Sequence, residues 1–158
     1  IDVWAEPNVA EAIINHMGYV FGEKHYPGAP KLTMNPLEEH QSITIGDNEI
    51  VPVRVYHGKL PILGYRIGPL AYLTDMSQLG EQEWGKLEGV ETLVVSALRD
   101  EPHATHQTIE EAIAFGRKVG AKRTYFIHMC HTAGKQADRD EQLPEGFCFA
   151  YDGLTIDC

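Results

Sequence analysis

Six side chains that could bind a metal ion or move a proton are spread between residues 57 and 131. They are His57, Asp75, His103, His106, His128 and His131. Imidazole nitrogen and carboxylate oxygen are both good ligands for Zn²⁺, and a carboxylate can bridge two ions. Each residue alone could equally be a turn residue or a helix cap, so a metal site requires that the fold bring several of them together.

Three short strands are expected to carry the first two of these residues. Residues 51–56, 62–67 and 70–74 are rich in β-branched and aromatic side chains, and glycine or proline bounds each run. Apolar residues occur on both faces, which is typical of strands that are buried on both sides. Polar residues at the ends of such strands lie where a sheet meets solvent and ligand. His57 and Asp75 occupy two of these ends.

The second half of the chain is expected to form a strand, a loop, a helix and another strand. The apolar run at 92–98 predicts a buried strand, and the polar loop at 99–106 contains two histidines. Thr108 and Glu111 have the spacing of a capping box at the start of a helix, whose first N–H groups could face an anion. The strand at 123–127 leads to the last two histidines. Open α/β sheets place their sites at such strand ends, which favours one shared site.

The ends of the chain are expected to surround this centre. Further strands are predicted at residues 1–5, 31–35 and 42–46. Pro7 suits the first turn of a helix that runs to about residue 17. The loop at 22–30 has turn composition, and its His25 is expected to be exposed. Asp152-Gly153 between two alternating runs predicts a closing hairpin. No repeat or linker interrupts residues 1–158, so a single structural unit of the α/β (α+β) class is expected.

Composition narrows the class of protein. A hydrophobic content of 43% in 158 residues is ordinary for a globular domain. The net charge of −10 argues against broad nucleic-acid binding, which depends on Lys and Arg. No apolar run approaches the roughly 18 residues that span a bilayer, and no signal peptide precedes the first strand, so a cytoplasmic location is expected. Cys130, Cys148 and Cys158 lack CxxC spacing, which favours reduced thiols.

The order of the histidine-bearing segments adds a family resemblance. The series VYHGKLPILGYRIGPLAYLTD, ALRDEPHATHQTIEEA, FIHMCH and LPEGFCFAYDGL resembles the metallo-β-lactamase superfamily over nearly the whole chain. Within it, the chain looks most like the phosphodiesterase branch that includes PhnP-type enzymes and lies near the tRNase Z enzymes. The resemblance implies an αββα sandwich and two divalent ions, Zn²⁺ or Mn²⁺.

The resemblance also implies a role for each candidate. His57 and His128 look like histidine ligands of the family, and Asp75 looks like the carboxylate that bridges two ions. His106 resembles the histidine that approaches the substrate phosphate, which makes it the catalytic candidate. Two others, His103 and His131, are expected to line the substrate, with solvated loop histidines as the alternative.

The chain departs from the family in one large respect. The HxHxDH motif, which supplies most ligands of both ions in the family, is absent from these 158 residues. In the family this motif lies upstream of a strand like that at residues 1–5. The sequence is therefore expected to be the C-terminal part of the sandwich and to catalyse little alone.

The expected reaction of the intact protein is hydrolysis of a small or cyclic phosphodiester at a dinuclear site. Hydrolysis of a thioester or lactone is the alternative within the superfamily. A non-catalytic association module is the alternative from another class, since a half sandwich exposes an apolar sheet face. A small-molecule substrate and a homo-oligomer are expected, without a membrane or nucleic-acid partner.

Overall fold

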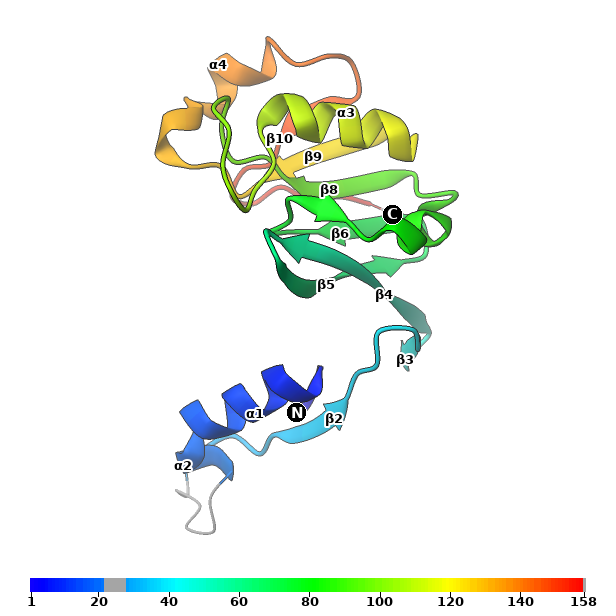
Figure 1. Ribbon diagram of the computed structural model, residues 1–158, viewed down its shortest axis with the longest axis vertical. Coiled ribbons are helices and arrows are strands. Elements are labelled where there is room, and N and C mark those ends of the chain that lie inside the picture. The colour runs from blue at the N-terminus through cyan, green and yellow to red at the C-terminus, as the bar shows by residue number, and fades with distance from the viewer. Residues whose placement is uncertain (22–27, 158) are drawn as a thin grey trace. The chain divides into compact units, whose positions relative to one another are not determined.

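The computed structural model describes residues 1–21 and 28–157. His25 and Cys158, for which the sequence predicts an exposed turn and a reduced thiol, lie outside the described residues. Sequence reasoning expected one structural unit, whereas the contacts divide the chain into two compact units, Ile1–Ile43 and Thr44–Cys158. Each unit is described below by itself (Figure 1).

The first unit contains a two-stranded parallel sheet and two helices. Strand β1 (Asp2–Ala5) pairs with β2 (Thr33–Pro36), as expected for strands in these stretches. Helix α1 (Pro7–His16) begins with proline in its first turn, and α2 (Gly18–Phe21) follows almost directly. The predicted helix is therefore present, but the glycine after it begins a second short helix.

The second unit is built on a mixed sheet. Its strands have the order β10-β9-β8-β6-β5-β4-β3, and β7 also pairs with β4. The bounds are β3 Ile43–Ile45, β4 Asn48–His57, β5 Leu60–Ile67, β6 Leu70–Leu73, β7 Gln78–Leu79, β8 Thr92–Ser96, β9 Arg123–Ile127 and β10 Phe147–Phe149. The strands predicted around residues 51–74, 92–98 and 123–127 are all present.

The direction of the strands places the candidate residues on one edge. Strand β5 is antiparallel to both β4 and β6, so β4 and β6 run the same way. Strands β8 and β9 continue parallel to β6. The C-terminal ends of these four strands therefore meet at one edge of the sheet, which is where α/β proteins form their sites.

Helix α3 (Ile109–Val119) lies against β8 and covers part of the sheet (Figure 1). The predicted capping box forms, because the Thr108 hydroxyl accepts from the Glu111 N–H and the Glu111 carboxylate accepts from the Thr108 N–H. Gly120 ends the helix in the left-handed conformation. Helix residues Ile109, Ala112 and Phe115 join the strand residues in one buried apolar core, which holds the sheet edge in place.

The predicted closing hairpin is wrong. Strand β10 pairs in parallel with β9, and the turn at Asp152-Gly153 is followed by no strand within residues 154–157. The Phe126 carbonyl on β9 accepts from the Ala150 N–H, so β10 meets the sheet before the turn is reached. The short helix expected at residues 81–87 is present as η1 (Glu81–Leu87). Two further short helices are η2 (His131–Ala133) and α4 (Gln136–Asp140). Within the described residues, no helix is both long and apolar enough to span a membrane.

Candidate metal centre

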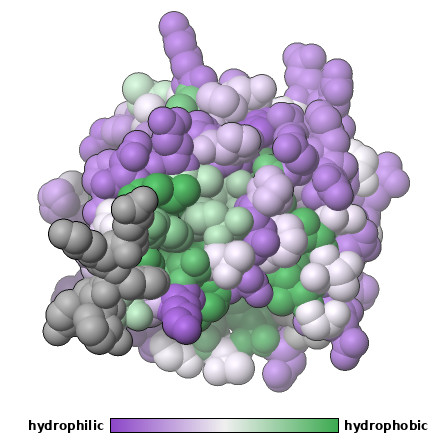
Figure 2. Space-filling model, turned by 90° about the horizontal axis from the view of Figure 1, so that it is seen from below, coloured by the Kyte–Doolittle hydropathy of each residue, from purple (hydrophilic) through white to green (hydrophobic). Residues whose placement is uncertain are grey.

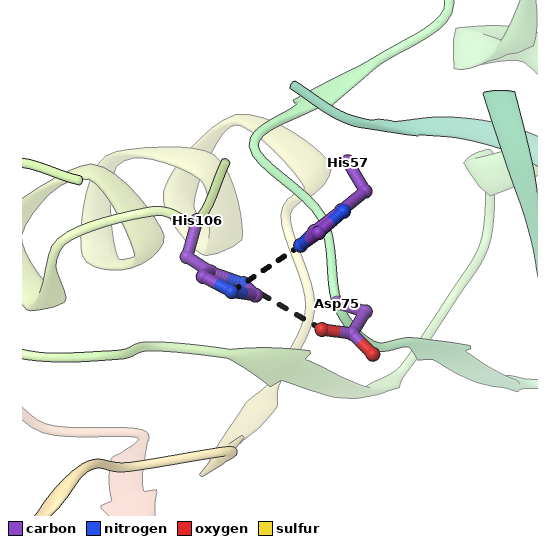
Figure 3. A group of neighbouring side chains, drawn as sticks. All are labelled: His57, Asp75 and His106. Atoms are coloured by element: carbon purple, nitrogen blue, oxygen red, sulfur yellow. Dashed lines mark hydrogen bonds and ion pairs between the residues drawn. The ribbon is translucent and has the colours of Figure 1, made fainter. Parts of the chain in front are cut away.

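Three of the six candidate residues converge at the shared strand edge. His57 ends β4, Asp75 lies two residues after β6, and His106 lies in the loop between β8 and α3. Their side chains point toward one another from these three segments (Figure 3). One ligand atom from each lies within 4.8 Å of the others. Residues separated by up to 49 positions therefore form one cluster.

Two separations in this cluster bear on whether it can bind a metal ion. His57 Nε2 lies 3.4 Å from His106 Nε2, and His106 Nδ1 lies 3.6 Å from the nearer Asp75 oxygen. Both distances exceed the usual length of a good hydrogen bond. Two atoms that each lie about 2.1 Å from a tetrahedral Zn²⁺ are about 3.4 Å apart. The 3.4 Å between the His57 and His106 nitrogens matches this spacing, whereas Asp75 faces the other ring nitrogen of His106, which cannot bind the same ion. The donors thus fit a divalent ion in chemistry, and the His57–His106 pair also fits in spacing.

His106 provides a second indication that the cluster binds something. Its side chain is only 10% exposed, and its buried Nδ1 has no hydrogen-bond partner among the described residues. Most buried polar side-chain atoms in proteins are bonded. A ring nitrogen buried in this way beside a carboxylate fits a site for a metal ion or for a polar ligand.

Burial and neighbouring charges lower the pKa of His106. Burial is the largest cause, because it disfavours the charged imidazolium, and the positive charges that His128 and His57 can carry act in the same direction. The Asp75 carboxylate opposes them. The ring is therefore neutral at physiological pH and keeps a lone pair on one nitrogen, as a ligand or a proton acceptor requires.

His128 joins the cluster through the carboxylate. Its Nε2 lies 3.3 Å from an Asp75 oxygen, and its ring centre lies 4.9 Å from that of His106. His128 and Asp75 are the non-glycine residues with positive φ, at 64° and 60°, in the described chain. This backbone conformation is unfavourable for such residues and often marks a functional site.

The two substrate candidates lie in different places. The ring of His103 stacks on that of His106 at 4.9 Å, and its Nδ1 accepts a hydrogen bond from the Thr105 N–H at 3.3 Å. His131 begins η2, is exposed, and lines a hollow of about 190 Å³ next to Met129. Among the described residues, no hydrogen bond, ion pair or ring contact joins His131 to the cluster. The structure therefore brings together five of the six sequence candidates.

Ser77 is a residue at the site for which sequence reasoning proposed no role. Its hydroxyl bonds to the backbone on both sides of His57. The available signal was its position two residues after a candidate carboxylate ligand, which is weak because serine is common in turns.

A family model described as the β-lactamase superfamily domain matches residues 1–129 of the chain. Together with the α/β fold and the histidine–carboxylate cluster, this match defines the class of protein. The chain belongs to the metallo-β-lactamase superfamily, whose members are metal-dependent hydrolases. Both the resemblance and the fold class expected from the sequence are confirmed.

Individual relatives place the chain more finely. An octanoyltransferase of Porphyromonas gingivalis (strain ATCC BAA-308 / W83) is 37% identical over 153 residues, covering 96% of this chain and 31% of the relative. The crystal structure of a new diphosphatase from the PhnP family is 32% identical with a TM-score of 0.88, covering 98% of this chain and 56% of that one. The chain thus spans about a third and about half of these relatives.

Two more distant structures share the fold. The short form of human tRNase Z is 18% identical, with a TM-score of 0.67 over 99% of this chain and 67% of that chain. Zn²⁺-bound PqqB from Methylobacterium extorquens is 16% identical, with a TM-score of 0.76 over 100% of this chain and 65% of that chain. A protein of this fold therefore binds zinc.

Proposed function

We propose that this chain contributes to the active site of a metal-dependent phosphodiesterase that acts on a small or cyclic phosphodiester. The observation that carries the proposal is the convergence of His57, Asp75 and His106 within 4.8 Å at one sheet edge. The PhnP-family diphosphatase, at 32% identity, supports phosphate-ester chemistry over other reactions of the superfamily.

His57, Asp75 and His128 would hold the metal. The site would hold two divalent ions, Zn²⁺ or Mn²⁺. Asp75 would be their shared ligand, because a carboxylate offers two oxygens. Bound divalent ions lower the pKa of a water ligand and neutralise charge on phosphate oxygens. Asp75 and His128 both have positive φ, and their side chains approach within 3.3 Å of each other.

His106 would act on the substrate. It lies between His57 and His128, with ring contacts of 4.8 and 4.9 Å, and presents a mostly buried ring to the same space. The neutral ring can donate an N–H hydrogen bond to a phosphoryl oxygen, and it could protonate the leaving oxygen only after first accepting a proton. His103, stacked against it at the exposed side, and His131 would contact the substrate.

The substrate would be a small anion. The protein would be located in the cytoplasm. Net charge is −10, so the chain lacks the broad positive surface that nucleic acid requires. Histidines and bound metal would supply positive charge locally instead. These features support a small-molecule phosphodiester and argue against a nucleic-acid or membrane partner.

A thioester or lactone hydrolase is the second candidate. The relative that is 37% identical bears the name octanoyltransferase, and octanoyl transfer is chemistry at an acyl carbon. A dinuclear centre that activates water for attack on phosphorus would also serve attack on an acyl carbon. The name of this relative is the specific observation that favours acyl chemistry.

A paired substrate assay separates these candidates. The full-length natural protein, loaded with Mn²⁺ or Zn²⁺, is compared on bis-p-nitrophenyl phosphate and on an octanoyl thioester, beside an Asp75→Asn variant. We expect hydrolysis of the phosphodiester, and loss of both bound metal and activity in the variant. Turnover of the thioester alone would favour the second candidate, and phosphodiester turnover that survives Asp75→Asn would refute the proposed centre.

A further inference from the structure

The hydroxyl of Ser77 joins the two strand ends that carry His57 and Asp75. It accepts a hydrogen bond from the Gly58 N–H at 3.1 Å and donates one to the Tyr56 carbonyl at 2.9 Å. These two backbone groups belong to the residues immediately before and after His57. Ser77 itself lies two residues after Asp75, so one side chain links the backbone next to both ligands.

The main chain reinforces this link. The Ser77 N–H also donates to the Tyr56 carbonyl, at 2.8 Å, and β7 continues the pairing with β4 beyond it. Removing the hydroxyl would leave this backbone bond but free the Gly58 N–H. His57 would remain paired with Leu60 of β5. The hydroxyl is thus the group that ties the turn after His57 to the segment that follows Asp75.

The backbone on both sides of this link has positive φ. Asp75 has a φ of 60°, and left-handed backbone is unfavourable by roughly 1–2 kcal/mol for a residue with a side chain. Gly58 has a φ of 62°, and a Cβ there would lie 3.0 Å from Thr105 Cγ2, in the loop that carries His106. Surrounding contacts must hold such conformations in place.

Met76 extends the same network to His106. Its N–H donates to the Ser96 hydroxyl at 3.2 Å, and its carbonyl accepts from the Gln107 N–H at 3.2 Å. Gln107 follows His106 directly, and the Met76 side chain is fully buried. Hydrogen bonds between residues adjacent to the ligands therefore connect all three segments of the cluster.

We propose that Ser77 is a positioning residue, whose hydroxyl sets the separation of His57 and Asp75 and thereby the geometry of the bound metal. The inference rests on the metal centre of the proposed function. Groups that orient metal ligands typically change affinity by 10–100-fold when they are removed. A purely structural serine would instead change the stability of the fold and leave the metal unaffected.

Cobalt tests this inference without an activity assay. The full-length natural protein is titrated with Co²⁺ as wild type, Ser77→Ala and Ser77→Thr, and binding is followed by the visible d–d absorption of the ion. We expect affinity to fall about tenfold in Ser77→Ala, with a changed d–d spectrum, and to be largely restored by threonine, which keeps the hydroxyl. Gln142→Ala is the control, because Gln142 also bonds to a backbone carbonyl, that of Asp138, but in α4.

The outcomes are distinct. Equal Co²⁺ affinity and identical spectra in wild type and Ser77→Ala, with both folded by circular dichroism, would overturn the role of Ser77 and leave the metal centre standing. An equal loss in Gln142→Ala would show a general effect of destabilisation and would also overturn it. A wild-type chain that binds no Co²⁺ would refute the metal centre and this inference together.

Discussion

The geometry of His106 fits two roles, that of a metal ligand and that of a group acting on the substrate. It belongs to the compact cluster with His57 and Asp75, whereas the family resemblance gives the ligand role to His128. His128 nonetheless lies 3.3 Å from Asp75, closer than the 3.6 Å between His106 and the same carboxylate. The closer approach favours His128 as the ligand and leaves His106 to act on the substrate.

His106→Ala should therefore reduce turnover and leave the bound metal in place. A positioned acid or base contributes about 10²–10⁴-fold to rate, so kcat for the phosphodiester is expected to fall at least about 100-fold. Metal content is measured on the same samples by plasma mass spectrometry, with His16→Ala, an exposed histidine of α1 outside the cluster, as control. Loss of metal in His106→Ala would make this residue a ligand instead.

The lowered pKa of His106 predicts how stability changes with pH in the metal-free protein. Burial and the neighbouring His57, His103 and His128 lower this pKa, and Asp75 only partly opposes them. The unfolded chain then binds more protons than the folded chain below about pH 6.5. The free energy of unfolding is therefore highest above that pH, and it decreases as the pH falls toward the pKa that His106 has in the folded protein.

Urea unfolding in EDTA at about pH 7.5 and 5.5 measures this effect. Wild type should lose more stability between the two pH values than His106→Gln, in which the buried titrating ring is gone. His40→Gln, which changes an exposed histidine, is the control. Identical pH dependence in wild type and His106→Gln would show that protonation of His106 is not coupled to folding.

At the scale of single residues, the sequence indicates a candidate where a residue type that can bind metal stands at the end of a predicted strand. The positions of His57, Asp75 and His128 at or just after strand ends could be predicted, because the apolar pattern of each strand is clear. The link made by Ser77 could not, because it depends on two backbone groups that only the folded turn brings to one hydroxyl. Contacts of this kind carry no periodic signal in the sequence.

At the scale of elements, helix α3, which follows the loop that carries His106, packs closely on the sheet. Gly116 lies where this helix meets the last strands. A Cβ there would lie 2.8 Å from Phe147 Cε1 and 2.9 Å from the Thr124 hydroxyl oxygen. The helix can approach the sheet this closely because position 116 has no side chain.

Gly116→Ala should destabilise the second unit although alanine favours helix. Overpacking of a core typically costs about 1–3 kcal/mol, which outweighs the gain in helix propensity. Gly85→Ala is the matched control, because no atom lies within 4 Å of a Cβ at that glycine, and it should be neutral or slightly stabilising. Urea unfolding compares the two, and equal midpoints would show that α3 does not pack as described.

The elements themselves were largely predictable, and the exceptions have physical causes. The capping box of α3 and the three central strands have strong local signals. The prediction of a hairpin at Asp152-Gly153 was wrong because β10 completes its pairing with β9 before that turn. Pairing in parallel with a distant strand depends on tertiary contacts that a turn signal cannot report.

At the scale of the whole molecule, the first unit exposes several large apolar side chains to solvent. They are Ile1, Trp4, Val9, Ile14 and Tyr19, with exposures between 36% and 80%. Helix α1 has no buried residue, although its sequence is amphipathic. Figure 2 shows one face of the molecule, on which hydrophobic side chains lie open among hydrophilic ones. Exposed apolar surface of this kind favours association.

Self-association of this chain is accordingly expected. Light scattering coupled to size exclusion should give a mass above the 17.6 kDa of one chain at micromolar concentration. Replacing Val9 and Ile14 of α1 with Gln should shift the mass toward that of one chain, while Tyr72→Gln, an exposed residue of β6, should not. A monomer at all concentrations would contradict the expected homo-oligomer.

Anomalous diffraction from crystals grown with Zn²⁺ tests the central claim most directly, because it locates the ion without reference to activity. We predict a peak at the zinc edge within about 2.0–2.2 Å of a His57 nitrogen and an Asp75 oxygen. Zinc bound only elsewhere on the protein, or no peak at the strand edge at a saturating concentration, would contradict the metal centre.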